Sequence, residues 1–330
     1  MTNEISHLLE IIETHRSFLL LSHVDPDGDA IGSLIAFALL IERKGKKAVA
    51  YDQDGVPEIY RFLKGCDRIV SVIPPAEHFE VAVFLECPDV RRAGTACSPF
   101  IEKIPLWVNI DHHMENSRFG HLNIIDENLS ALGETLFDLY RESKEPMDSA
   151  VAEALYAAIM TDTGSFKYIN TTPRAHEISA QLIRLGINPY RMYEEIFETL
   201  SRPAALIAAR AHSTLEIDNG ISCITITLDM FKETGSTADD TQEIVNLGRN
   251  IKDVEVALLF RETANGVKVS LRSKHNVNVN EIAVKFGGGG HLRAAGCTIE
   301  ADMKHAKEMI FAAVRKALQE ASGHARPNER

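Results

Sequence analysis

A short acidic segment follows an apolar run near the beginning of the chain. His23, Asp25, Asp27 and Asp29 lie within seven residues, and a proline and a glycine among them favour a tight loop. One aspartate could cap a following helix and another could fix the turn, but three carboxylates stand beside one imidazole. Carboxylates this close raise one another's pKa unless a cation neutralises them. Ligand type and density therefore predict that this cluster binds a metal ion rather than only capping a helix.

Two further clusters could supply ligands. Asp111, His112 and His113 follow the apolar run 106–110. Because adjacent strand residues point to opposite faces, the two histidines can serve different purposes, and a carboxylate next to a ligating imidazole commonly supports it. Asp162 ends a helical pattern, where the helix dipole disfavours a carboxylate. That violation favours a ligand over a plain helix-terminating turn.

The remaining charged motifs are weaker when each is taken alone. Glu86 ends another apolar run, with Arg92 close behind it. A glycine-rich segment, 287–290, exposes backbone N–H groups that can approach an anion, and His291 and Arg293 add donors. Upstream, alternate basic residues share one face of a strand: Lys268, Arg272 and Lys274. A flexible turn and a solvated charge stripe are the structural alternatives, but together the two motifs predict a local phosphate pocket.

These motifs lie at the ends of elements that alternate along the first half of the chain. Continuous apolar runs predict strands, and amphipathic patterns between them predict helices. The strands are 18–23, 47–52, 81–87, 106–113 and 122–126, and the helices are 30–47, 129–143 and 147–164. Such strands are typical of a parallel sheet covered on both faces. The predicted fold class is therefore α/β, with a doubly wound, mostly parallel sheet that binds ligands beyond its carboxyl edge.

The second half of the chain changes character after a long helical stretch. Strands rich in β-branched residues at 220–229, 254–263 and 266–274 precede the glycine-rich segment and a final helix at 303–322. We predict four parts: a first domain over 1–190, a helical linker over 191–215, a smaller mixed α/β domain over 216–322 and a disordered tail over 323–330.

Composition limits the classes of partner. The 330 residues carry a net charge of −12, which argues against long nucleic acid but allows a short anionic substrate in a local basic pocket. No apolar run reaches the ~20 residues of a membrane span, and the acidic, polar start is unlike a secretory signal, so we expect a cytoplasmic protein. The five cysteines are scattered, which predicts buried thiols rather than disulfides or a thiolate zinc site.

Five segments, taken in order, resemble the successive motifs of the DHH phosphoesterase superfamily with its DHHA1 C-terminal domain. They are HVDPDGDAIGS (23–33), ECPDVRRAG (86–94), DHHMENSRFG (111–120), TDTGSFKYINTT (161–172) and GGGGHLRAAG (287–296). The resemblance extends from about Ile12 to Ala317 and is strongest to the oligoribonuclease (nanoRNase) and pAp phosphatase branch. It implies a DHH metal-site domain followed by a DHHA1 substrate-binding domain.

The resemblance also implies roles for individual residues. It implies two divalent ions, usually Mn²⁺, with Mg²⁺ as the alternative. His23 and Asp27 would hold one ion, the other would be held by Asp29, His112 and Asp162, and Glu86 would lie between them. His113, supported by Asp111, would face the scissile phosphate. The implied substrate-binding residues are Arg92, Arg272, Gly288, Gly289, Gly290, His291 and Arg293.

One position departs from the family pattern, because aspartate is usual where this chain has Glu86. The longer side chain could still bridge two ions, or it could loosen one site. The implied function is hydrolysis of very short RNA to mononucleotides and of 3′-phosphoadenosine 5′-phosphate (pAp) to AMP, by a water activated between two metals. The alternatives are a phosphodiesterase for cyclic di-AMP or pApA, an inorganic pyrophosphatase, and a non-catalytic nucleotide-binding module. The expected partners are short RNA, pAp or dinucleotides, without a membrane, and a homodimer stays open.

Overall fold

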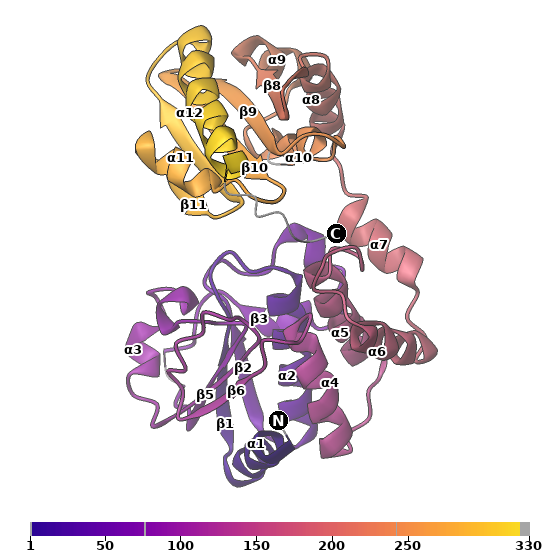
Figure 1. The fold of residues 1–330 in the computed structure, drawn as a ribbon. Helices are drawn as coiled ribbons and strands as arrows, with labels where there is room; N and C mark the ends of the chain where they lie inside the picture. The colour runs from indigo at the N-terminus through magenta and orange to yellow at the C-terminus, as the bar shows by residue number, and fades with distance from the viewer. Residues whose placement is uncertain (1, 76, 242, 324–330) are drawn as a thin grey trace. The chain divides into compact units, whose positions relative to one another are not determined.

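The structure is a computed structural model that describes residues 2–75, 77–241 and 243–323. The chain divides into two compact units, Met1–Thr199 and Leu200–Arg330, and Figure 1 shows the sheet and helices of each. Of the predicted tail, only Gly323 lies within the described residues, as the last residue of helix α12, Met303–Gly323. Each unit is described by itself.

The first unit is built on a six-stranded sheet with the order β3-β2-β1-β4-β5-β6. All of its strand pairs are parallel. The strands are β1 (Ser17–Leu21), β2 (Lys47–Tyr51), β3 (Ile69–Val70), β4 (Val81–Leu85), β5 (Leu106–Asp111) and β6 (Leu122–Ile125). Leu21 pairs with Phe84, and Leu85 pairs with Ile110. The carboxyl ends of β1, β4 and β5 therefore meet at one edge, where an open α/β sheet binds ligands.

Helices cover both faces of this sheet. One face packs against the helices α1 (Thr2–Thr14), α2 (Gly28–Arg43), α4 (Leu132–Ser143), α5 (Ser149–Asp162), α6 (Pro173–Arg184) and α7 (Pro189–Phe197). The opposite face carries η3 (Val90–Ala93) and α3 (Ser98–Ile101). Two short 3-10 helices, η1 (Glu58–Tyr60) and η2 (Cys66–Arg68), lie between β2 and β3. The prediction of a doubly wound, parallel α/β domain is confirmed.

The second unit contains a separate six-stranded mixed sheet with the order β11-β12-β10-β9-β8-β7. Its strands are β7 (Glu216–Asp218), β8 (Ile221–Ile226), β9 (Val256–Thr263), β10 (Gly266–Ser273), β11 (Gly289–His291) and β12 (Ala294–Ile299). Only β8 and β9 pair in parallel within this sheet. Helices α11 (Val279–Lys285) and α12 cover one face. Helices α8 (Arg202–His212), α9 (Leu228–Thr234) and α10 (Ile244–Arg249), with η4 (Asp239–Thr241), lie on the other.

The predicted linker, 191–215, contains parts of both units. Met192 and Ile196 of α7 belong to the hydrophobic core of the first unit, whereas Ile207 and Ala211 of α8 belong to a core of the second. Its role as a linker stays a prediction.

No helix among residues 2–75, 77–241 and 243–323 is long and apolar enough to cross a membrane. The five cysteines are free thiols, and four of them are buried.

Candidate functional site

The loop between β1 and α2 positions the first predicted cluster. His23 is buried, its Nδ1 lies 2.9 Å from the carbonyl of Val24, and its Nε2 lies 4.0 Å from Oδ1 of Asp27. Asp27 caps α2 by accepting the N–H of Ala30 at 3.0 Å. Asp25 has a φ of 57° and shapes the turn. The capping carboxylate is thus Asp27 rather than Asp29, which leaves Asp29 for contacts farther away in the chain.

Asp29 is buried where two helix termini meet. Its carboxylate accepts the N–H groups of Leu132 at 2.5 Å and of Gly133 at 3.1 Å, at the first turn of α4. Helix N-termini favour negative charge, so these two hydrogen bonds lower the pKa of Asp29 and partly offset the rise that burial causes. On the other side, Gly28 approaches α5 so closely that a Cβ would lie 2.4 Å from Thr161. Close packing at Gly28 therefore brings the start of α2 beside the carboxyl end of α5.

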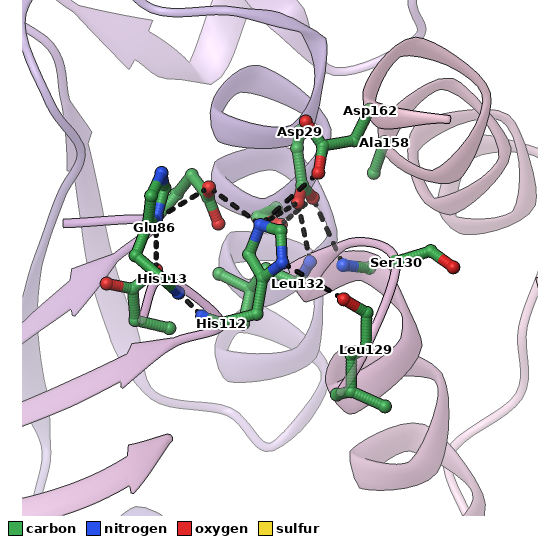
Figure 2. Close-up of polar contacts among 12 residues, drawn as sticks. Asp29, Glu86, His112, His113, Leu129, Ser130, Leu132, Ala158 and Asp162 are labelled. Atoms are coloured by element: carbon green, nitrogen blue, oxygen red, sulfur yellow. Dashed lines mark hydrogen bonds and ion pairs between the residues drawn. The ribbon is translucent and has the colours of Figure 1, made fainter. Parts of the chain in front are cut away.

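Three carboxylates converge on one imidazole nitrogen of His112 (Figure 2). Nε2 of His112 lies 3.1 Å from Glu86, 3.3 Å from Asp162 and 3.8 Å from Asp29. Its Nδ1 lies 3.2 Å from the carbonyl of Leu129, so Nδ1 carries the proton when the ring is neutral. The lone pair of Nε2 then points at the carboxylates. This arrangement suits a cation bound in place of the shared proton.

Glu86 is the most constrained residue of the site. It follows β4 with a φ of 57°, which a non-glycine residue adopts at a cost, and only 1 % of it is exposed. One carboxylate oxygen contacts His112 and lies 3.3 Å from Nδ1 of His113. The other oxygen, Oε2, is buried without a hydrogen-bond partner among the described residues. An unpartnered carboxylate oxygen is costly to bury, and a metal ion would satisfy it.

The protonation states of these groups are strongly coupled. Burial raises the pKa of Asp29 to about 6 and that of Asp162 to about 7. Burial also raises the pKa of Glu86 well above its usual value, and the negative charge of Asp29 raises it further. For His112, burial opposes the charged form, but Glu86, Asp29 and Asp162 raise its pKa to about 11. Without a metal, the site therefore holds extra protons that a divalent cation would replace.

His113 points to a different partner from its neighbour. Its Nδ1 lies 2.8 Å from Oδ1 of Asp111, which is buried at the end of β5. The second oxygen of Asp111 accepts the side-chain amide of Asn116 at 2.6 Å. His113 itself is half-exposed, with 44 % of its side chain accessible. The two adjacent histidines thus have separate environments, and the Nδ1 contact of His113 leaves its Nε2 for a ligand.

In the part of the chain that the structure describes, two sets of side chains could hold a metal, with their ligand atoms within 4.8 Å of one another. The sets are Asp29, His112 and Asp162, and Glu86, His112 and His113. The first set contains the three residues that are predicted to hold one of the two ions. His23 and Asp27 belong to neither set, although the charge of Asp27 raises the pKa values of Asp29 and Asp162. The ligand roles of all six predicted metal residues stay predictions.

The predicted substrate-binding residues lie on exposed segments. Arg92 is an exposed residue of η3, and its carbonyl accepts the N–H of Val24 at 2.7 Å, which joins its loop to that of His23. In the second unit, Gly289 and Gly290 form β11 with His291 and pair with β12. Gly290 has a φ of 148°, and a Cβ there would lie 2.4 Å from the carbonyl of Ala294. Part of the glycine run is therefore explained by the fold of this hairpin.

The predicted donors around the hairpin are also accessible. Gly288 precedes β11, His291 ends it and Arg293 lies in the turn to β12; both side chains are exposed. Arg272, on β10, is half-buried and pairs with Ala294 of β12. Lys274 lies beyond the end of β10, and its ammonium group contacts backbone carbonyls, 3.2 Å away in the case of Lys252. The basic stripe on the strand is therefore shorter than predicted.

Two residues that support the site, Asn170 and Asn116, were not predicted from the sequence. Asn170 donates to the carbonyls of Ser130 at 3.2 Å and Asp162 at 3.0 Å, and so joins the loop that contacts His112 to the end of α5. Asn116 lies inside the segment 111–120, but only its contact with Asp111 shows its role. A polar residue close behind the histidine pair is the signal that could have identified Asn116.

Comparisons with known proteins identify the domains of the chain and its relatives. The model of the DHH family, N-terminal domain, matches residues 17–159, and the model of the DHHA1 domain matches residues 220–320. A curated protein of Thermus thermophilus, named bifunctional oligoribonuclease and PAP phosphatase NrnA, is 32% identical over 308 residues, covering 91% of this chain and 90% of that protein. The protein of the same name from Bacillus subtilis is 27% identical, covering 89% of this chain and 93% of that one.

A solved structure shows the same fold along the whole chain. The crystal structure of an exopolyphosphatase-related protein from Bacteroides fragilis superposes with a TM-score of 0.87 and covers 98% of each chain at 24% identity. The two family models together cover the segments 23–33, 86–94, 111–120 and 287–296, and the segment 161–172 follows the match of the first model. The chain belongs to the DHH family with a C-terminal DHHA1 domain, and within it to the family of the bifunctional oligoribonuclease and PAP phosphatases.

Proposed function

We propose that this protein is a metal-dependent phosphoesterase that hydrolyses very short RNA oligonucleotides to mononucleotides and pAp to AMP. The names of its relatives, oligoribonuclease and PAP phosphatase, support both activities. The net charge of −12 fits short substrates rather than long nucleic acid. We also propose that it acts in the cytoplasm.

One observation carries the proposal. Asp29, Glu86 and Asp162 surround a single nitrogen of His112, and the buried Oε2 of Glu86 has no hydrogen-bond partner among the described residues. A structural ion pair would satisfy one carboxylate, not three. Negative charge concentrated at the carboxyl edge of a parallel sheet needs a divalent cation, and a cation there can bind a phosphate.

The types of residue present suit divalent ions, and the ligand atoms of Asp29, His112 and Asp162 lie within 4.8 Å of one another. In this proposal Asp29, His112 and Asp162 would hold one ion, His23 and Asp27 would hold the other, and Glu86 would be a further ligand. Carboxylate oxygens with imidazole nitrogens match the preferences of Mn²⁺, with Mg²⁺ as the alternative. When bound, such ions polarise a phosphoryl group and lower the pKa of a coordinated water.

His113 and Asp111 provide proton transfer in this proposal. Asp111 accepts the Nδ1 proton of His113 at 2.8 Å and stabilises the charged ring, which raises the pKa of His113. Asn116 fixes the other oxygen of Asp111, so the imidazole is held in one orientation. Nε2 of His113 can then donate a proton to the departing oxygen of the ester. Substrate groups away from the reaction are assigned to Arg92 and, in the second unit, to Arg272, His291, Arg293 and the glycines 288–290.

A substrate panel tests the proposal. Purified protein with Mn²⁺ is incubated with pAp, pApA, a short RNA series, cyclic di-AMP and pyrophosphate, and products are followed by chromatography. We expect pAp and short RNA to be hydrolysed, and Asp162→Ala to abolish hydrolysis while an exposed match, Asp67→Ala, retains it. Preferential hydrolysis of cyclic di-AMP or pyrophosphate would overturn the substrate assignment. Full activity of Asp162→Ala would overturn the site.

A further inference from the structure

Glu134 is a buried carboxylate that the proposed function leaves unassigned. It lies in the first turn of α4, it is 0 % exposed, and its Oε1 accepts the N–H of Ser130 at 2.8 Å. Helix α4 begins after Ala131, whose side chain provides no cap. Glu134 therefore reaches back over the start of its own helix, as the glutamate of a capping box does, and fixes the segment that leads into it.

Arg174 supplies the positive charge next to Glu134. Oε2 of Glu134 lies 3.1 Å from Nε of Arg174, and neither atom has a hydrogen-bond partner among the described residues. Burial raises the pKa of Glu134, while the hydrogen bond from Ser130 and the charge of Arg174 lower it. Because a buried carboxylate without its paired cation is strongly destabilising, the ionised form of Glu134 depends on Arg174.

The segment that Glu134 fixes contacts two of the predicted metal ligands. The carbonyl of Leu129 lies 3.2 Å from Nδ1 of His112, and two N–H groups in the first turn of α4 donate to Asp29. The Leu129 carbonyl keeps the proton of the neutral imidazole on Nδ1, which leaves the lone pair on Nε2 for a cation. Partners of this kind orient ligating groups, and their loss typically weakens metal binding 10–100-fold.

Arg174 belongs to the stretch of chain that follows Asp162. Thr172, the N-cap of α6, donates its N–H to Oγ of Ser130 at 3.3 Å. Asn170, two residues earlier, donates to the carbonyls of Ser130 and Asp162. The ion pair of Glu134 and Arg174 is thus the charged part of a contact that joins the end of α5 to the segment before α4.

A plain ion pair between α4 and α6 is the structural alternative for these two residues. The chain contains a comparison for it, because the guanidinium group of Arg174 also contacts Asp138. Asp138 lies four residues after Glu134, hence one turn farther along α4 and away from the segment that contacts the ligands. Substitution of Asp138 therefore weakens the packing of the two helices without releasing that segment.

We propose that Glu134 and Arg174 are positioning residues of the metal centre. Together they hold the carbonyl of Leu129 on His112 and the start of α4 on Asp29, and so they preorganise the ligands of an ion bound there. The inference rests on the proposed function, since it assumes a metal ion at this centre. Neither residue touches the ion or the substrate in this proposal.

The test measures Mn²⁺ binding to the full-length protein by calorimetry. Glu134→Gln and Arg174→Met should each weaken binding about tenfold. Arg174→Lys keeps the positive charge, so it should bind Mn²⁺ more tightly than Arg174→Met does. Asp138→Asn removes the other partner of Arg174 and is the matched control, and it should leave the Mn²⁺ affinity unchanged.

The double variant Glu134→Gln/Arg174→Met tests whether the two residues act as one unit. Independent effects would multiply to about a hundredfold loss, whereas a coupled pair should lose about tenfold, as each single variant does. The proposal is overturned by a hundredfold loss, by equal weakening in Asp138→Asn, by equal affinities of Arg174→Lys and Arg174→Met, or by unchanged affinity of the single variants. If Arg174→Met does not fold, Glu134→Gln decides, and unchanged affinity overturns the proposal.

The proton on Nδ1 of His112 gives a readout that a loss of stability alone would not move. With Mg²⁺ in place of the paramagnetic Mn²⁺, ¹⁵N NMR should find this proton in the wild type. It should exchange with solvent faster in Glu134→Gln than in the wild type, and Asp138→Asn should not change the exchange. Unchanged exchange in Glu134→Gln, beside weaker metal binding, would overturn the positioning role through Leu129.

Failure of the proposed function has a different signature. If the wild type binds Mn²⁺ but hydrolyses neither pAp nor short RNA, the activity is wrong, and the metal affinities of the variants still decide the positioning role. If the wild type hydrolyses pAp and the variants bind Mn²⁺ as tightly as it does, only the positioning role is wrong. If the wild type binds no Mn²⁺, both are wrong.

Discussion

The Glu86→Gln substitution should have opposite effects on stability with and without metal. Glutamine has nearly the same shape as glutamate and keeps one oxygen for the contact with His112 at 3.1 Å. It removes the charge from a residue whose Oε2 is buried without a hydrogen-bond partner among the described residues. The substitution therefore tests the charge of Glu86 rather than its packing.

In EDTA at pH 8 we expect Glu86→Gln to be more stable than the wild type. Burial raises the folded-state pKa of Glu86 above its unfolded value. The folded protein then binds the proton more tightly, and this contribution to stability is present below the unfolded pKa and lost as the pH rises through the folded pKa. Each unit of pKa is worth about 1.4 kcal/mol. Because the new amide is also incompletely hydrogen-bonded, we expect a net gain of about 1 kcal/mol.

Saturating Mn²⁺ should reverse this order. A ligand at 1,000 times its dissociation constant stabilises the folded state by about 4.1 kcal/mol. A hundredfold weaker variant at the same Mn²⁺ concentration is at ten times its dissociation constant and gains about 1.4 kcal/mol. The variant should therefore lose about 2.7 kcal/mol of metal stabilisation relative to the wild type, which exceeds its gain in EDTA.

Tryptophan fluorescence provides an assay for the first unit alone. Trp107 is the single tryptophan of the chain and lies on β5, 5.5 Å from the ring of Phe84 on β4. Urea unfolding followed at Trp107 gives the free energy of unfolding of this unit with EDTA or Mn²⁺. Glu142→Gln, an exposed position on α4, is the matched control. If Glu86→Gln is less stable than the wild type in EDTA, or gains as much as the wild type from Mn²⁺, the assignment of Glu86 is refuted.

Three further substitutions test other parts of the first unit. His113→Gln should lower kcat for pAp about 10²–10⁴-fold while mass spectrometry finds the same bound metal, and loss of metal would make His113 a ligand instead. Asn170→Ala removes the amide that joins the Ser130 and Asp162 carbonyls, so calorimetry should find Mn²⁺ bound about 10–100-fold more weakly; unchanged affinity would contradict that role. Burial raises the pKa of Asp52 to about 7, so its stabilising contribution is lost as pH rises from about 4 to 7. Asp52→Asn should be about 1–2 kcal/mol more stable than the wild type at pH 8 and equal near pH 4 by urea unfolding; an equal gain at both pH values would show that titration is not the cause.

The first sheet could be predicted largely because its strands are continuous apolar runs. The runs at 81–87 and 106–113 form β4 and β5. Glu86 directly follows β4, and Asp111 is the last residue of β5, as the motifs indicated. Strand β3, Ile69–Val70, was not predicted because two residues are too few to form a pattern. Its pairing with β2 depends on tertiary contacts.

The types of the site residues could be predicted, but their contacts could not. Asp162 was identified because a carboxylate ends a helix, and it does end α5. The sequence contains no indication that Asp29 accepts the N–H groups of α4, because that contact depends on how α2 and α4 pack. The positive φ of Glu86 costs conformational free energy, and it persists only because the surrounding structure holds the residue there. Sequence propensities therefore could not predict this conformation.

The topology of the first unit determines when during folding its metal site can exist. Asp29 and the Leu132 N–H that it accepts are 103 residues apart, and Glu86 and His112 are 26 apart. Closing such long loops costs entropy before any contact repays it. His23, Asp27 and Asp29 are close in sequence, but no local segment of an unfolded chain brings Asp29 together with Glu86 and His112. Ions bound at this centre would therefore leave the rate of folding nearly unchanged. They would stabilise the folded unit by slowing its unfolding.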